Sequence, residues 1–199
     1  MSWLGSLFLA GLLFSGVSGA LASPPDSPLL LLGPSSQRPP VVRFLPDAHR
    51  TIVYPAMVDS YALAKPLRSP GSKGWESLVA DSLERSGLLL STLDPLLVRD
   101  SKGVLQMAVL STDSPLVATS VMTKGFLTKF SALFGPELLV VIPARNKVYV
   151  FPKLANKLPE MSGTIRDDYL ISPMPVSTEL FELSKSGLKA VGSVDHDEH

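Results

Sequence analysis

The first 25 residues carry no charged side chain, and this feature divides the chain into two unequal parts. Residues 4–17 form an apolar stretch, and residues 20–22 (Ala-Leu-Ala) place two small residues just before Ser23. A secretory signal peptide combines an apolar centre of roughly 7–15 residues with a small-x-small cleavage site. The sequence therefore predicts a signal peptide over residues 1–22, which leaves residues 23–199 to build the fold.

A membrane anchor is the alternative interpretation of this segment. A bilayer-spanning helix needs about 20 apolar residues, and residues 3–22 just reach that length. However, four glycines and several serines interrupt the stretch, and no Lys or Arg precedes it. We therefore expect an exported protein that is periplasmic or extracellular. If the segment is retained, the protein is instead a single-pass protein of the inner membrane with its domain outside.

The composition of the remaining chain excludes several classes of function. All 18 basic and all 18 acidic residues lie in it, so its net charge is zero and it has no basic excess to neutralise nucleic-acid phosphates. The chain has no cysteine, which excludes disulfides, thiol catalysis, thiolate metal sites and a lipoprotein anchor. We predict no cofactor, and a protein or another envelope component as the partner.

Proline divides the exported part into a linker and a domain. Residues 23–46 contain seven prolines with serines between them, and because proline fixes φ and removes a backbone donor, we expect an extended linker there. Leu29 to Leu32 form an apolar island that either packs onto the domain or belongs to the leader. The prediction is a single α+β domain over residues 47–193, followed by a polar tail over residues 194–199.

The spacing of apolar residues predicts two helices. The first runs from about residue 73 to residue 86, and Gly87 is suited to the left-handed position after its end. The second begins after Thr123, a plausible N-cap, and ends at Gly135-Pro136. Residues 154–169 are ambiguous and are expected to hold one or two helical turns. The predicted apolar faces comprise Trp75, Leu78, Val79 and Leu83 in the first helix, and Phe126, Leu127, Phe130, Leu133 and Phe134 in the second.

Short apolar runs separated by turn residues predict strands. The expected strands are residues 51–54, 96–99, 104–110, 116–121 (a strand or an extended segment), 138–142, 148–151, 180–183 and 188–191. Three pairs of these strands are predicted to be hairpins, namely 96–99 with 104–110, 138–142 with 148–151, and 180–183 with 188–191. Residues 138–142 are uninterruptedly apolar, which is typical of a strand covered on both faces. The order predicts an α+β fold, in which two or three helices pack on a mainly antiparallel sheet.

Two stretches of the second half resemble a known family. Residues 138–151 (LLVVIPARNKVYVF) form an apolar strand, a proline, a short turn and a second apolar strand. Residues 175–183 (PVSTELFEL) and 186–189 (SGLK) lead into a closing hairpin. Both resemble the YtpQ-like proteins, an uncharacterised bacterial family, over roughly residues 72–192. The resemblance implies a fold and a bacterial origin. It implies no activity, and members of that family are longer and lack an export segment.

The candidate catalytic residues are few. A Ser-His-Asp arrangement inside the domain would have to use His49, because the other histidines lie in the tail. Asp167 and Asp168 are the best carboxylate pair, and Glu160 could join them only through the tertiary fold. Adjacent residues diverge on a helix or a strand, so we expect a solvated role for all of these groups.

Arg145, Asn146 and Lys147 are the candidate binding residues, since they occupy a predicted hairpin tip and such tips are often exposed. The tail, residues 195–199, contains Asp, Glu and His, but a free end lacks the second shell that fixes metal ligands, so we expect no metal site. Residues 71–74 (GSKG) lack the P-loop spacing and are expected to be a loop.

The hypothesis favoured by the sequence is an exported bacterial α+β domain that acts as a binding or structural module without enzymatic activity. The first alternative is an exported hydrolase whose carboxylates meet only in the fold. The second is a membrane-anchored domain.

Overall fold

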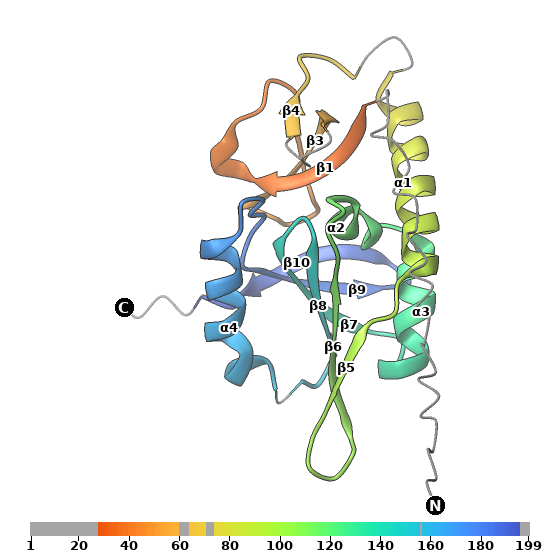
Figure 1. Cartoon of the computed structure of the whole chain (residues 1–199), viewed down its shortest axis with the longest axis vertical. Coiled ribbons are helices and arrows are strands. Elements are labelled where there is room, and N and C mark those ends of the chain that lie inside the picture. The colour runs from red at the N-terminus through yellow and green to blue at the C-terminus, as the bar shows by residue number, and fades with distance from the viewer. Residues whose placement is uncertain (1–27, 60–63, 71–73, 156, 196–199) are drawn as a thin grey trace, which may run out of the picture.

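Two antiparallel sheets and four α-helices make up the fold of the described residues in a computed structural model, as Figure 1 shows. The described residues are 28–59, 64–70, 74–155 and 157–195. The predicted α+β class is therefore confirmed, although the strands form two sheets rather than one. The predicted signal peptide, the start of the predicted linker and residues 196–199 of the tail lie outside the described residues.

The larger sheet has six strands, and every neighbouring pair is antiparallel. The three predicted hairpins are confirmed, with Gly103 and Gly187 at positive φ in two of the turns. The strand order is β10 (Gly187–Ser193), β9 (Glu179–Ser184), β7 (Leu138–Ala144), β8 (Lys147–Pro152), β6 (Leu105–Ser111) and β5 (Leu96–Arg99).

Helices cover both faces of this sheet. On one face lie α1 (Gly74–Thr92), α2 (Leu116–Ser120) and α3 (Lys124–Phe134), and on the other lies α4 (Leu158–Ile171). The side chains of β7 accordingly point to the two faces in turn, since Val140 packs in the core beneath α3 and Val141 packs in the core beneath α4. The expectation that residues 138–142 are covered on both faces is confirmed.

The smaller sheet is built around β3 (Thr51–Val58). Strand β1 (Leu29–Pro34) pairs with one edge of β3, and the short strands β2 (Arg43–Phe44) and β4 (Ala64–Pro66) share the other. A 3-10 turn, Ser35–Gln37, follows β1. Residues 29–32 are the apolar island of the sequence, and all four leucines are at most 2% exposed. This part of the expected linker therefore belongs to the folded core, because leucines that alternate between two apolar clusters gain more by burial than by solvation.

The free edge of β1 is satisfied by side chains instead of by another strand. The backbone N–H of Leu30 donates to Ser82 Oγ on α1 (2.8 Å), and the Leu30 carbonyl accepts from Thr119 Oγ1 on α2 (2.9 Å). Two residues further along, the Leu32 carbonyl accepts from Arg145 Nε (3.0 Å). Buried backbone polar groups need partners, so these three side chains allow an edge strand to lie inside the protein.

Helix α1 is longer than the sequence predicts. It continues through Gly87 to Thr92, and its buried face consists of Leu78, Ser82, Ser86 and Leu90. Two serines on the buried face hide the helical pattern, because polar side chains interrupt the apolar spacing. They are buried because Ser82 Oγ accepts from β1 and Ser86 Oγ donates to the Ser82 carbonyl (2.7 Å).

Two further segments differ from the prediction. Residues 116–120 form the helix α2 rather than a strand, and the Ser114 hydroxyl accepts a hydrogen bond from Leu116 N at its start (3.3 Å). Helix α4 has 14 residues, more than the one or two turns expected, and Ile165 is its fully buried residue. The predicted N-cap of α3 is confirmed, since Thr123 Oγ1 accepts from Phe126 N (3.2 Å).

The start of the expected tail is also part of the fold. Val194 is 7% exposed, and its N–H donates to the Thr178 carbonyl (2.9 Å). Among the described residues, no helix combines the length and the apolarity needed to cross a bilayer.

Candidate functional site

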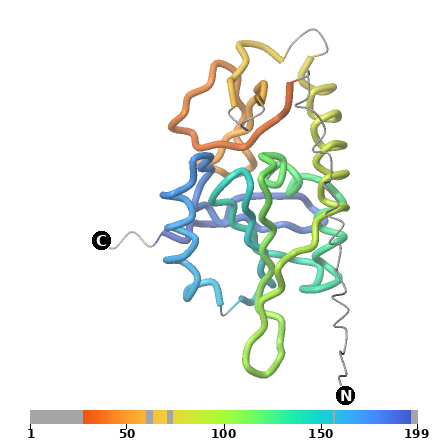
Figure 2. The backbone as a smooth tube through the Cα atoms, in the orientation of Figure 1, coloured from red at the N-terminus to blue at the C-terminus, as the bar shows by residue number. Residues whose placement is uncertain are grey.

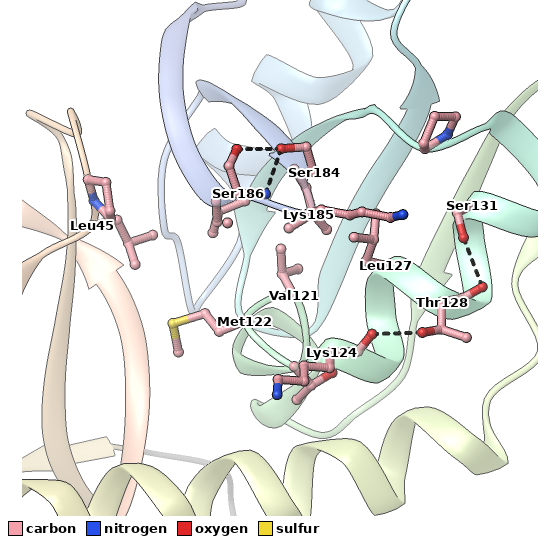
Figure 3. A pocket seen from close by; sticks show the side chains of 16 residues that line it. Leu45, Val121, Met122, Lys124, Leu127, Thr128, Ser131, Ser184, Lys185 and Ser186 are labelled. Atoms are coloured by element: carbon pink, nitrogen blue, oxygen red, sulfur yellow. Dashed lines mark hydrogen bonds between the residues drawn. The ribbon is translucent and has the colours of Figure 1, made fainter.

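A groove of about 720 Å³ opens between helix α3 and the β9–β10 hairpin, and Figure 3 shows it from close by. One wall is α3 with the residues just before it, Val121 to Thr123. The opposite wall is the hairpin, residues 183–188, and Leu45 with Pro46 closes one side. The volume falls within the range of about 300–1,000 Å³ that is typical of ligand pockets.

Apolar side chains form most of the groove surface. Val121 is buried, and Met122, Leu127 and Leu188 are half-buried members of the main core that also face the groove. Leu45 lies on the opposite side of the opening from α3 in the close-up view (Figure 3). The groove is thus an extension of the hydrophobic core that stays open to solvent, and it can desolvate an apolar ligand.

Among the residues that the structure describes, two lysines and no carboxylates line this apolar surface. Lys124 comes from the first turn of α3 and Lys185 from the tip of the hairpin, where its side chain extends beside Leu127 (Figure 3). Neither lysine forms an ion pair within the part of the chain that the structure describes. By contrast, Lys153 and Lys189 both pair with Glu182.

Hydroxyl groups on both walls are already held by the protein. Ser184 Oγ and Ser186 Oγ lie 2.7 Å apart across the hairpin turn, and Ser131 Oγ donates to the Thr128 carbonyl (3.2 Å). The N-terminus of α3 faces the same groove and adds a partial positive charge beside Lys124. The groove therefore combines an apolar surface with positive charge at its rim.

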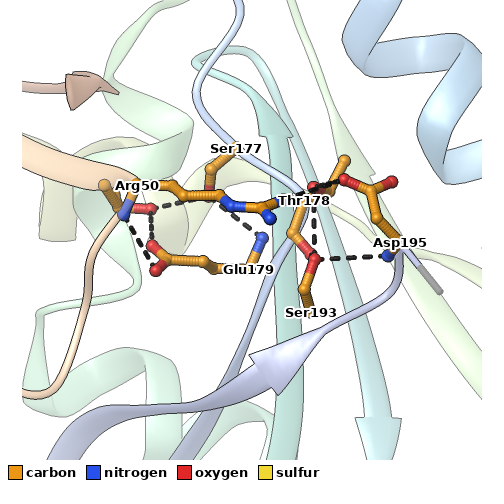
Figure 4. Close-up of polar contacts among 7 residues, drawn as sticks. Arg50, Ser177, Thr178, Glu179, Ser193 and Asp195 are labelled. Atoms are coloured by element: carbon orange, nitrogen blue, oxygen red, sulfur yellow. Dashed lines mark hydrogen bonds and ion pairs between the residues drawn. The ribbon is translucent and has the colours of Figure 1, made fainter. Parts of the chain in front are cut away.

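The Leu45–Pro46 side of the groove is fixed by a buried carboxylate on β9, drawn in Figure 4. Glu179 is 4% exposed and accepts from the backbone N–H groups of His49 (2.7 Å) and Arg50 (2.9 Å) and from Thr51 Oγ1 (2.6 Å). Thr51 Oγ1 also lies 2.6 Å from Ser177 Oγ. These bonds tie the loop that follows Pro46 to the larger sheet.

A second set of contacts continues this network to the C-terminal end of the described chain. Asp195 Oδ2 accepts from Thr178 Oγ1 and from Arg50 Nη1, the latter at 3.1 Å (Figure 4). The Pro46 carbonyl accepts from Ala190 N on β10 (2.9 Å). The loop is thus bonded to β10 through Pro46 and to the residue that follows β10 and Val194 through Arg50, in addition to its bonds with Glu179.

His49, the candidate catalytic histidine of the sequence, lies in the loop beside Glu179. Its side chain is exposed, and the contact that ties the residue to Glu179 is made by its backbone N–H. The buried hydroxyls of Thr51 and Ser177 bond to Glu179 and to each other. They form a structural network between the sheets.

Arg145 is buried instead of exposed at a hairpin tip. It is 4% exposed, its Nη2 donates to Tyr54 Oη (2.5 Å) and to Gln37 Oε1 (3.4 Å), and its Nε bonds to Leu32. The prediction that Arg145 is exposed is wrong, because the smaller sheet packs on this turn. Burial raises the pKa of Tyr54, against the lowering effect of the Arg145 charge, and burial also lowers the pKa of Arg145.

Asn146 and Lys147 are half-buried, and Lys147 Nζ pairs with Asp168 Oδ1 (2.8 Å). Asp168 also accepts from the hydroxyl of Tyr149, and these bonds fasten α4 to β8. Burial and the neighbouring Asp168 carboxylate both raise the pKa of Tyr149. The Asp168 side chain thus has two partners within the protein.

Asp167 is exposed on α4, and Glu160 pairs with Lys157 at the start of the same helix. None of the three predicted carboxylates lines the groove. Among residues 28–59, 64–70, 74–155 and 157–195, no group of three or more metal-ligating acidic or histidine side chains gathers.

Local sequence patterns do not reveal Lys124, Lys185 or the groove that they line. Leu127 was placed correctly on the apolar face of a helix, but helical spacing does not reveal that this face meets a hairpin some 60 residues away. A lysine at the tip of an apolar hairpin is a weak signal, because flanking charge is the usual way to solvate a turn.

Comparison with protein-family models, with curated proteins and with solved structures finds no match to this chain. The resemblance to the YtpQ-like family therefore stays a prediction, and the functional argument depends on the groove itself.

Proposed function

We propose that the protein is an exported, non-enzymatic binding domain and that the groove between α3 and the β9–β10 hairpin is its ligand site. Export is inferred from residues 1–22 of the sequence. The observation that carries the assignment of the site is the open apolar groove of about 720 Å³.

The chemistry of the lining supports binding over catalysis. General acid-base or nucleophilic catalysis needs a nucleophile and a base in mutual hydrogen-bond reach, with a third group to orient them. The residues that line the groove include serines, threonines and lysines but no His, Asp or Glu. The hydroxyls of these serines and threonines bond to one another or to backbone carbonyls three or four residues earlier in the chain.

An uncharged apolar dye whose fluorescence rises on desolvation tests the proposal. We expect the dye to bind the purified domain, and Leu127→Glu to weaken binding at least about tenfold, because it places a carboxylate in the apolar surface. The matched control is Leu154→Glu, at a leucine that is 89% exposed and precedes α4 on the other face of the sheet. The control should bind the dye like the wild type.

Circular dichroism shows whether both variants keep the fold. Equal dye binding by folded Leu127→Glu and by wild type would overturn the assignment of the groove. Turnover in a panel of hydrolase substrates that is abolished by Asp168→Ala would instead support the hydrolase alternative.

A further inference from the structure

We infer that the ligand of the groove is a single-chain anionic amphiphile, namely one alkyl or acyl chain that ends in a carboxylate or phosphate. This inference rests on the proposed function, and it adds the chemical class of the ligand. It is carried by the pairing of an apolar surface with Lys124 and Lys185 in a lining without carboxylates.

The apolar surface fits a chain better than a compact polar ligand. Leu45 comes from the loop after β2, Val121 from the connection between α2 and α3, Leu127 from α3 and Leu188 from β10, and together they line the groove from different sides. Burial of alkyl groups against such a surface provides most of the binding free energy of an amphiphile, and it is independent of the head group. The alkyl chain of the ligand therefore determines whether binding occurs at all.

The two lysines determine the sign of the head group. Lys124 comes from α3 and Lys185 from the hairpin, their side chains point in different directions at the groove (Figure 3), and neither has a carboxylate partner among the described residues. A carboxylate or phosphate beside either lysine gains a charge-assisted hydrogen bond, and beside Lys124 the N-terminus of α3 adds a favourable dipole. A cationic head group would meet two like charges, so the groove disfavours it.

A peptide strand is a poorer occupant of this site. Strand β10 is an edge of the larger sheet, and an added strand would pair with its outward-facing backbone groups. However, the N–H of Ala190 already donates to the Pro46 carbonyl (2.9 Å), so the loop covers this part of the edge. Strand addition along β10 is therefore blocked beside the groove.

A membrane surface is also a poorer match. Binding to a bilayer requires apolar side chains that project from the surface. Here Val121 is buried, and Met122, Leu127 and Leu188 are half-buried between the two walls. A groove of this shape takes a monomeric chain out of water.

The test compares ligands that share one chain length and differ in head group. Dodecyl phosphate, dodecanoate and dodecyltrimethylammonium are titrated by calorimetry below their micelle-forming concentrations. We expect both anions to bind at least about tenfold more tightly than the cation, with an affinity that falls as salt is added.

The variants Lys124→Met and Lys185→Met keep the aliphatic stem and remove the charge. Each substitution should lower the affinity for dodecyl phosphate about threefold, and the two together about tenfold, without changing the affinity for the uncharged dye. The matched control is Lys102→Met, in the turn of the β5–β6 hairpin that projects away from the rest of the chain (Figure 2). The control should bind dodecyl phosphate like the wild type.

The outcomes separate this inference from the proposed function. Two results would contradict the anionic head group but leave the groove as the site. One is binding of the dye together with equal affinities for the anionic and cationic ligands. The other is an affinity for dodecyl phosphate that is the same in the double lysine variant and in the wild type. Loss of dye binding altogether would overturn both. Co-sedimentation with anionic lipid vesicles in the absence of binding to monomeric dodecyl phosphate would identify a membrane surface as the ligand, and the inference would be wrong.

Discussion

Charged side chains have opposite surroundings in two regions of this protein. Where the two sheets meet, the protein itself supplies hydrogen-bond partners for Arg145 and Glu179, and both are 4% exposed. At the groove, Lys124 and Lys185 lie at the surface beside apolar side chains and have no ion-pair partner in the described chain. We refer to the first region, Ser82, Thr119, Arg145 and Glu179 with their partners, as the sheet junction.

This contrast separates architecture from function. A charge that is fully hydrogen-bonded inside the fold has no capacity left for a ligand, and its removal leaves buried groups unpaired. A charge at the rim of an apolar groove costs little in stability and is free to recognise a ligand. Substitutions at the sheet junction should therefore change the free energy of unfolding, whereas substitutions of the groove lysines should change binding.

The largest expected effect on stability is that of Glu179→Ala. The change leaves the N–H groups of His49 and Arg50 and the hydroxyl of Thr51 without their acceptor, and we expect a loss of about 3–5 kcal/mol in the free energy of unfolding. Urea denaturation measures it. The control Glu160→Ala, at an exposed ion pair, should cost less than about 1 kcal/mol. Equal losses in the two variants would refute the buried role of Glu179.

Arg145→Met should have the next largest effect. Methionine roughly fills the space but leaves the Leu32 carbonyl and the Tyr54 hydroxyl without their donor, so we expect a loss of about 2–4 kcal/mol. Denaturation of Tyr54→Phe, which removes only one of these contacts, should show a smaller loss. If Arg145→Met is as stable as the wild type, the smaller sheet does not depend on this side chain.

The free energy of unfolding should also fall at alkaline pH, because Tyr54 and Tyr149 ionise less readily in the folded protein than in the unfolded chain. Their pKa values in the folded protein lie above the ordinary value of 10.0, so above that pH the unfolded chain loses protons that Tyr54 and Tyr149 retain in the fold. The wild type should lose about 1 kcal/mol at about pH 11 relative to neutral pH, and Tyr149→Phe should lose less. Parallel pH profiles of the two proteins would contradict the assignment to Tyr149.

The smallest expected effect on stability is that of Lys124→Met and Lys185→Met. Both lysines are exposed and form no ion pair with a described residue, so each change should alter the free energy of unfolding by less than about 0.5 kcal/mol. Thermal denaturation of both variants checks this. A loss comparable to that of Arg145→Met would make the groove lysines structural and remove the contrast between the two regions.

Local patterns made much of the fold predictable. The hairpins, the capped helix after Thr123 and the doubly covered strand at residues 138–142 follow from turn residues, an N-cap and an apolar run, all of which act over a few residues. Their burial and register then follow from the alternation of side chains along each strand.

Contacts between distant residues were not predictable. Leu29 to Leu32 sit among prolines, and the chain shows no local sign that Ser82, Thr119 and Arg145 will satisfy the free edge of this strand. For the same reason Arg145 was expected at an exposed tip. The groove has the same origin, since its two lysines are some 60 residues apart and line one groove only in the tertiary fold.

The most direct test of this account is a titration of the isotope-labelled protein with monomeric dodecyl phosphate, followed by NMR of the backbone amides and lysine side chains. The account predicts that the largest shift changes occur at Lys124, Leu127, Lys185 and Leu188 and leave α4 unaffected. Changes confined to α4, or none at ligand concentrations just below micelle formation, would contradict it.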